Sequence, residues 1–124
     1  MYHGKEVVVK LSEEAEKVYD ELNKIVGEEK SKGVESSFHQ TLLRSINRIK
    51  ELLKINPFAG DQVSKFRIPQ KYDKKYEAEN VWRIELADRW RLVYTINGNQ
   101  VEIITFIMDI FSHKDYDKVF GYKS

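Results

Sequence analysis

Hydrophobic residues recur along this chain in two periods, one typical of helices and one typical of strands. The β-branched run at residues 7–11 (VVVKL) predicts a first strand. After Ser12, apolar residues recur every three or four positions as far as Val26, and Gly27 follows. This spacing predicts an amphipathic helix that Ser12 caps and that Gly27 and the polar stretch of residues 28–33 end.

A second helical pattern covers residues 38–53 (FHQTLLRSINRIKELL). Ser37 and Gln40 stand at the spacing of a capping box, and Pro57 disfavours a helical conformation at Asn56. The polar face of this helix carries Arg44, Asn47, Arg48, Lys50, Glu51 and Lys54. Two amphipathic helices joined by a short polar loop predict an antiparallel hairpin that covers one face of a sheet.

Residues 58–80 show no clear period, which predicts a loop of roughly twenty residues. Within it lies a basic and aromatic segment, in which Tyr72 and Tyr76 stand among several cations. The basic residues are Lys65, Arg67, Lys71, Lys74 and Lys75. This segment either contacts phosphate groups or is a solvated loop, and the sequence alone leaves both interpretations open.

The last third of the chain alternates as strands do. Residues 81–86 and 90–96 alternate apolar with polar, Asn97 and Gly98 predict a tight hairpin, and residues 101–108 are apolar on both faces. We therefore predict a single α+β domain over residues 1–124. It has an N-terminal strand, an antiparallel helical hairpin and a three-stranded antiparallel meander. Together these give a four-stranded sheet whose last strand is central, followed by a short C-terminal helical turn.

The predicted register determines which side chains share a face. A three-residue loop at residues 87–89 places Glu85 opposite Arg91 and Arg83 opposite Val93. A two-residue turn at Asn97 and Gly98 would place Arg91 opposite Ile104 and Val93 opposite Glu102. The apolar face, including Trp82 and Trp90, would then pack on the helices. The other face would present Arg83, Glu85, Arg91 and Glu102 together.

Composition narrows the function classes. The 124 residues are 41% hydrophobic and 33% charged, as expected for one folded domain, and the net charge is only +1. Any nucleic-acid interface must therefore be a local basic patch. Because the chain has no cysteine, it has no disulfide, thiolate metal site or cysteine nucleophile. No apolar run is long enough to span a membrane, so we expect a cytoplasmic protein with no membrane partner.

Three segments of the chain, VWRIEL (81–86), WRLVY (90–94) and SHK (112–114), together with Val119 and Phe120, carry a family resemblance. With the predicted element order, they resemble the RelE/ParE superfamily of toxins from toxin–antitoxin systems, and the RelE-like branch in particular. RelE-like members cut mRNA on the ribosome without a metal, whereas ParE-like members inhibit DNA gyrase. The resemblance thus implies a translation-inhibiting mRNA endoribonuclease with no cofactor. Its implied partners are mRNA, the ribosome and an antitoxin protein, with which a toxin–antitoxin heterotetramer is one assembly.

The resemblance also implies roles for single residues. Arg91 matches the conserved arginine of the central motif, and Arg83 stands where RelE-like nucleases keep a lysine. Glu85 is the next outward position, where some members have a second lysine, and Lys114 stands where an arginine is usual. Phe120 stands at the position of the catalytic tyrosine, yet a phenylalanine cannot transfer a proton. We expect Tyr116 or Tyr122 to substitute for it.

Metal-free RNA cleavage uses the 2′-hydroxyl group as nucleophile and requires a base, an acid and cations around the phosphate. Glu85 could be the base, the guanidinium groups of Arg83 and Arg91 suit phosphate, and His113 could be the acid. The predicted catalytic set is Arg91, Arg83, Glu85, His113 and Lys114. Simpler alternatives remain at this stage: a cross-strand ion pair between Glu85 and Arg91, and a capping role for His113.

Other functions also fit the sequence. The absence of a tyrosine at position 120 and the near-neutral charge favour a non-hydrolytic protein. Such a protein would be a ParE-like gyrase inhibitor, or a decayed toxin that now serves as an antitoxin-binding partner. An unrelated α+β binding module is a third alternative. A metal site on Asp109, His113, Asp115 and Asp117 is disfavoured by their loose spacing.

Overall fold

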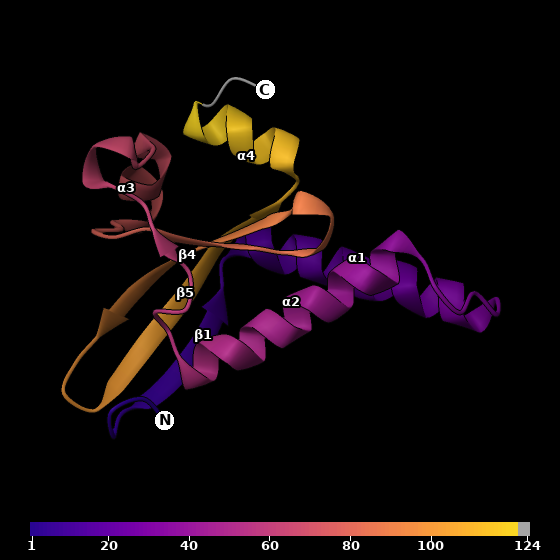
Figure 1. Cartoon of the computed structure of the whole chain (residues 1–124), viewed down its shortest axis with the longest axis horizontal. Helices are drawn as coiled ribbons and strands as arrows, with labels where there is room; N and C mark the ends of the chain where they lie inside the picture. Colours follow the sequence, from indigo (N-terminus) through magenta and orange to yellow (C-terminus); the bar gives the residue numbers. More distant parts are fainter. Residues whose placement is uncertain (122–124) are drawn as a thin grey trace.

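A mixed five-stranded sheet forms the centre of the molecule in the computed structural model, which describes residues 1–121 (Figure 1). The strands are β1 (Glu6–Leu11), β2 (Asp61–Gln62), β3 (Trp82–Glu85), β4 (Arg91–Gly98) and β5 (Glu102–Phe111). Their order is β1-β5-β4-β3-β2, with β1 parallel to β5 and the other pairs antiparallel. The α+β class and the meander β3-β4-β5 are confirmed. The predicted four-stranded sheet is wrong in strand number, because β2 adds a fifth strand beside β3.

The predicted helical hairpin is present as α1 (Glu13–Ser31) and α2 (Phe38–Ile55), which cover one face of the sheet (Figure 1). The hydroxyl oxygen of Ser12 accepts a hydrogen bond from the Ala15 amide at 3.0 Å, which confirms this cap. The helix continues past Gly27 and ends at Ser31, within the polar stretch of residues 28–33 that was predicted to end it together with Gly27. Gly27 is exposed within a helix that continues to Ser31, and a glycine there costs only about 1 kcal/mol relative to alanine.

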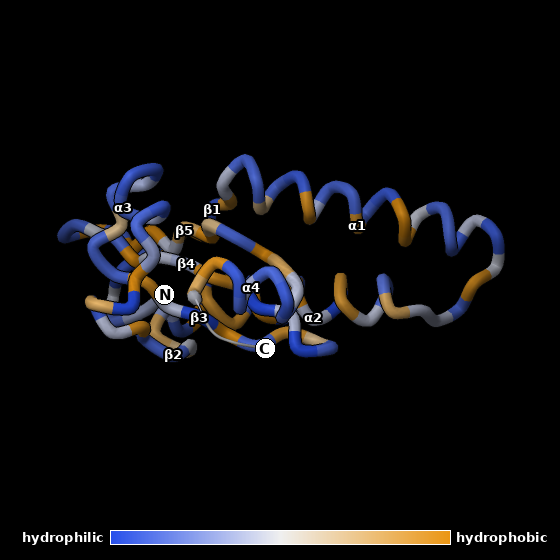
Figure 2. Tube along the Cα trace, turned by 90° about the horizontal axis from the view of Figure 1, so that it is seen from above, coloured by the Kyte–Doolittle hydropathy of each residue, from blue (hydrophilic) through white to orange (hydrophobic). Residues whose placement is uncertain are grey.

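The main hydrophobic core lies between this hairpin and the sheet. Figure 2 shows the hydrophobic residues of α1 along the side of the helix that faces α2. Trp82 and Trp90 are partly buried against this core, as predicted. Its buried members are Ala15, Leu22, Val26, Leu42, Leu43, Ile46, Ile49, Leu53, Leu86, Leu92, Tyr94, Ile107 and Ile110.

Residues 58–80 are not the long loop that we predicted. They contain β2, a single 3-10 turn at Lys65–Arg67 (η1) and helix α3 (Gln70–Tyr76). The α3 helix buries only Tyr72, so its sequence carries no hydrophobic repeat. The segment before β2 also passes very close to β3, since a Cβ atom at Gly60 would lie 2.5 Å from the carbonyl oxygen of Arg83.

A second apolar cluster covers part of the other face of the sheet, which we had predicted to be polar. Here α3 and α4 (His113–Phe120) lie on the side of the sheet opposite α1 and α2 (Figure 1). The helical turn predicted at the C-terminus is therefore confirmed as α4. The buried members of this second cluster are Val63, Tyr72, Ala78, Val81, Val93, Met108 and Tyr116.

The strand register is confirmed on one side of β4 and wrong on the other. Glu85 pairs with Arg91 and Arg83 with Val93, as predicted. However, Arg91 lies opposite Phe111 rather than Ile104, and Val93 lies opposite Asp109 rather than Glu102.

Two features cause this difference in register. Strand β4 continues through Gly98, and the turn forms beyond it, where the side-chain oxygen of Asn99 accepts hydrogen bonds from the amides of Val101 and Glu102. A bulge then leaves Met108 without a partner in β4, because Tyr94 pairs with Ile107 and Val93 with Asp109. Glu102 consequently lies far along β5 from the predicted cluster.

Candidate active site on the sheet face below α4

Arg83, Glu85 and Arg91 project from the same face of the sheet, the face opposite the helical hairpin. Their neighbours in sequence, Ile84 and Leu92, pack into the hairpin core, and side chains alternate between the two faces of a strand. The Glu85 carboxylate lies 3.2 Å from Nη1 of Arg91 across the β3–β4 pair. The predicted juxtaposition of these three side chains is therefore present.

Arg91 is held by one end of its guanidinium group. Its Nη1 atom donates to the carbonyl oxygen of Arg89 at 2.5 Å and to Glu85 at 3.2 Å. Asp88 and Arg89 both have left-handed backbone conformations, with φ of 53° and 63°, and so direct this carbonyl group at Arg91. In the described part of the chain, Arg91 makes its hydrogen bonds through Nη1. This arrangement leaves Nε and Nη2 to bind an anion.

Helix α4 contributes Tyr116 to the same cluster. The side chain is 3% exposed, and its hydroxyl oxygen accepts a hydrogen bond from Nη1 of Arg83. The Tyr116 ring centroid lies 5.7 Å from Cζ of Arg83 and 5.5 Å from Cζ of Arg91. Phe120 stacks on Tyr116 with a centroid distance of 4.4 Å. Thus Tyr116, and not residue 120, places a hydroxyl group beside an arginine, whereas Tyr122 lies outside the described residues.

His113 and Lys114 occupy the first turn of α4, and among residues 1–121 no hydrogen bond or ion pair joins them to the two arginines. The Nδ1 atom of His113 lies 3.3 Å from Oδ2 of Asp117 on the same helix. Lys114 is exposed. Ser112, rather than His113, caps α4, since its hydroxyl oxygen accepts from the Asp115 amide at 3.2 Å. Three residues of the predicted catalytic set, Arg83, Glu85 and Arg91, therefore lie together on the sheet. The other two, His113 and Lys114, lie on the neighbouring helix α4.

The cations of the basic segment, residues 65–75, also fall into two groups. The ammonium groups of Lys71 and Lys75 pair with Asp109 and Glu14, respectively. Lys65, Arg67 and Lys74 are exposed. The first two cations thus hold α3 on the body of the protein, and the other three remain at its surface.

The sequence did not indicate the buried contact below α3. The Tyr72 hydroxyl group donates to Oδ2 of Asp109 at 2.8 Å, and Nζ of Lys71 lies 2.8 Å from the same oxygen. Burial, followed by the nearby Asp109 carboxylate, raises the pKa of Tyr72 well above its ordinary value. A tyrosine that stays protonated can keep donating to Asp109, so α3 remains attached to β5.

Residues 1–121 contain no cluster of three or more His, Cys, Asp or Glu side chains suited to a metal ion. Among their helices, none combines the length and apolar character that a membrane crossing requires. No protein-family model matches the chain, and neither a curated protein nor a solved structure matches it significantly. The assignment to the RelE/ParE superfamily therefore stays a prediction.

Proposed function

We propose that this protein is a toxin of the RelE-like type, an endoribonuclease that cuts mRNA on the ribosome. In the reaction, the 2′-hydroxyl group of one nucleotide attacks the adjacent phosphorus atom, and Glu85 accepts its proton. Arg83 and Arg91 stabilise the negative charge on the phosphorane. A proton donated to the departing 5′-oxygen completes the cleavage and leaves a 2′,3′-cyclic phosphate. Tyr116 and His113 are the two candidates for this donor on α4.

The observation that supports this proposal most strongly is the shared face of Arg83, Glu85 and Arg91. Glu85 places a carboxylate oxygen, which can accept a proton, 3.2 Å from the guanidinium group of Arg91. Glu85 is also accessible, because 62% of its side chain is exposed. A purely structural ion pair would explain the contact between Glu85 and Arg91, but not the second arginine and the hydroxyl group beside them.

The substitution Arg91→Ala tests the proposal in a ribosome-programmed mRNA cleavage assay. Loss of one charge-stabilising donor is expected to slow cleavage about a hundredfold to a thousandfold. Lys24→Ala, which removes an exposed cation of α1, is the control and should cleave at the wild-type rate. Thermal unfolding of both variants checks that they are folded. Undiminished cleavage by Arg91→Ala would end the assignment.

One observation favours a second function. The Tyr116 ring, on which Phe120 stacks, lies against both arginines, so a phosphate group must share this space with that ring. A ParE-like gyrase inhibitor, or a decayed toxin that binds an antitoxin, would need no open phosphate site. Expression of the protein alone separates these functions. A nuclease stops translation and leaves cut mRNA, whereas a gyrase inhibitor causes DNA breaks while translation continues. Relief of either effect by a short neighbouring gene would identify the antitoxin.

A further inference from the structure

A hollow of about 450 Å³ lies where α2 meets the turn that follows β3. It is open on one side, and it contains two arginines to which the proposed reaction gives no role. The residues around it are Thr41, Arg44, Ser45, Arg48, Glu85, Leu86 and Ala87.

Arg44 and Arg48 are exposed and stand four positions apart on α2, so their side chains extend from one face of the helix. Within residues 1–121, neither guanidinium group pairs with an acidic side chain. Other cations of the chain do form such pairs: Lys54 lies 3.0 Å from Glu51 on the same helix. Two adjacent guanidinium groups without acidic partners provide paired N–H donors of the geometry that phosphate groups accept.

The inner wall of the hollow is fixed in place. The Ser45 hydroxyl group, only 8% exposed as a residue, donates to the carbonyl oxygen of Leu42 at 2.8 Å. The hydroxyl oxygen of Ser45 in turn accepts a hydrogen bond from the Ala87 amide at 3.2 Å, which joins α2 to the turn after β3. The two arginines are thus presented from a helix whose position relative to β3 is set by a buried contact.

Glu85 connects the hollow to the candidate active site. Glu85 is one of the residues that line the hollow, and its carboxylate pairs with Arg91, so the hollow adjoins the candidate site. Because Arg91 offsets the charge of Glu85, this carboxylate does not cancel the positive charge of Arg44 and Arg48.

We propose that Arg44 and Arg48 bind the phosphate backbone of single-stranded RNA next to the nucleotides held at Arg91. This inference rests on the proposed function. RNA fits better than an acidic protein segment, because the hollow continues from a site whose own cations suit phosphate. The strand would pass from Arg91 across the edge of the sheet at Glu85 and reach α2. Such contacts bind every sequence alike, since a phosphate carries no base information.

The test measures binding of a fluorescently labelled oligouridylate to the full chain by anisotropy at several salt concentrations. For single strands, each lost phosphate contact reduces the slope of log K against log salt by about 0.7. The double variant R44Q/R48Q should therefore reduce the slope by about 1.4. The double variant K17Q/K24Q removes the same charge from exposed positions of α1 and should keep the wild-type slope.

An unchanged slope in R44Q/R48Q, or no salt-dependent binding by the wild type, would overturn the inference. Displacement of the RNA by a polyglutamate peptide as effectively as by unlabelled oligouridylate would assign the hollow to an acidic protein segment instead. The proposed function is judged separately, by the cleavage rate of Arg91→Ala. A reduced slope with undiminished cleavage by that variant would preserve the RNA site and reject the catalytic role of Arg91, whereas a reduced slope with no cleavage by the wild type would preserve the RNA site and reject the nuclease.

Discussion

Two aromatic residues of α4, Tyr116 and Phe120, stack on one another and differ by a single hydroxyl group. The hydroxyl group belongs to Tyr116, and it accepts a hydrogen bond from Arg83. A phenol can transfer a proton and a phenyl ring cannot. Tyr116 is therefore the better-placed of the two proton-donor candidates on α4, since His113 pairs with Asp117 instead of the arginines.

The substitution Tyr116→Phe tests this role at the residue scale. If Tyr116 donates the proton to the leaving oxygen, single-turnover cleavage should slow by about two to four orders of magnitude. Stability should fall by about 1.5–3 kcal/mol, the value of a hydrogen bond to a charged group, as measured by urea unfolding. Tyr19→Phe is the control, because it removes a hydroxyl group that donates to Asn47 at 2.5 Å in the helical hairpin. Cleavage at the wild-type rate by Tyr116→Phe would leave His113 as the donor.

Strand alternation alone was enough to predict that three of the candidate site residues share one face of the sheet. Arg83, Glu85 and Arg91 lie on short strands joined by a three-residue connection, so one register accounts for all of them. Tyr116 could only be suggested as an alternative to Tyr122, because its place depends on how α4 packs back on the sheet. A signal was present, since Tyr116 and Phe120 stand four residues apart after the capping residue Ser112 and so share a helix face.

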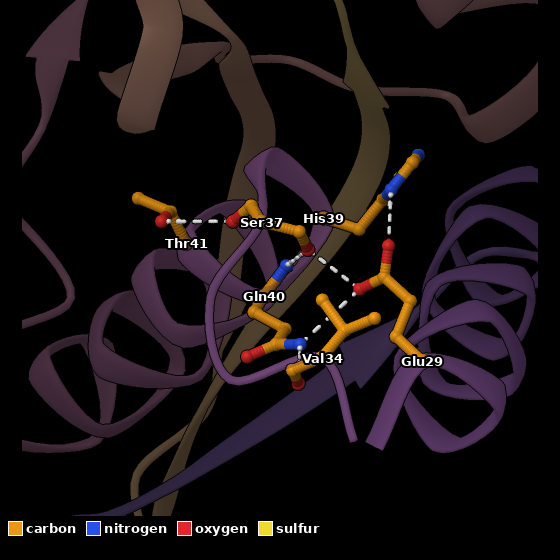
Figure 3. Close-up of polar contacts among 6 residues, drawn as sticks. All are labelled: Glu29, Val34, Ser37, His39, Gln40 and Thr41. Carbon is orange, nitrogen blue, oxygen red and sulfur yellow. Dashed lines mark hydrogen bonds and ion pairs between the residues drawn. The ribbon is translucent and has the colours of Figure 1, made fainter. Parts of the chain in front are cut away.

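At the scale of elements, one carboxylate joins the two helices of the hairpin. Glu29, near the end of α1, accepts hydrogen bonds from the Ser37 hydroxyl group at 2.5 Å and from Nε2 of Gln40 at 3.3 Å (Figure 3). Its second oxygen lies 3.2 Å from Nδ1 of His39. The capping box predicted at Ser37 is thus half formed. Gln40 donates its amide hydrogen to Ser37, but its side chain contacts Glu29 and Val34.

These contacts predict a pH-dependent stability. The hydrogen bond from Ser37, followed by those from His39 and Gln40, lowers the pKa of Glu29 below 4.5 despite an opposing effect of burial. A lowered folded-state pKa gives a stabilisation that is complete above about pH 4.5 and is lost as the pH falls through the folded value. Glu29→Gln should therefore melt at a lower temperature than the wild type at neutral pH, and the difference should disappear in strong acid.

The neighbouring Glu28→Gln is the control for this experiment, because it removes an exposed carboxylate one position away. It should melt at the wild-type temperature at both pH values. If the melting temperatures of Glu29→Gln and the wild type still differ in strong acid, the negative charge of Glu29 is not what stabilises the hairpin, and the side chain acts through its packing instead.

The elements that could be predicted are those with a long enough hydrophobic repeat. The two long helices and the strands β3 and β4 each carry several apolar positions in one period. Helix α3 has only seven residues and one buried side chain, so it leaves no repeat to detect. The turn between β4 and β5 was predicted at the wrong position for a different reason. Asn97 and Gly98 favour a two-residue turn, but Asn99 caps the amides that follow and extends β4 beyond them.

At the scale of the whole molecule, the sheet is covered on both faces by separate apolar clusters. One sign of this arrangement was present in the sequence, because β5 is apolar on both faces and its buried residues divide between the two clusters. It did not indicate which segments form the second layer, since α3 and α4 are too short to predict by period. Each cluster contains a fully buried tyrosine, Tyr94 below the hairpin and Tyr72 below α3.

These two tyrosines predict how the whole fold responds to alkali. The Tyr94 hydroxyl group donates to the carbonyl oxygen of Pro57 at 2.9 Å, and burial raises its pKa to about 12. Burial raises the pKa of Tyr72 as well. In the unfolded chain a tyrosine loses its proton near pH 10, so above this pH the folded state holds more protons. Stability should therefore fall between about pH 10 and pH 12, by about 1.4 kcal/mol per pH unit for each tyrosine.

Urea unfolding at several alkaline pH values measures the slope of the unfolding free energy against pH. Tyr94→Phe should make this slope less steep by about 1.4 kcal/mol per pH unit, the contribution of one proton. The variant can also be less stable at every pH, because it leaves the Gly60 amide without the hydroxyl group 3.0 Å away, but the slope does not depend on that offset. Tyr2→Phe is the control, since Tyr2 lies outside both clusters, and it should keep the wild-type slope. An unchanged slope in Tyr94→Phe would mean that alkali enters the hairpin core before the protein unfolds. The alkaline transition would then be local, and the two layers would not unfold as one cooperative unit.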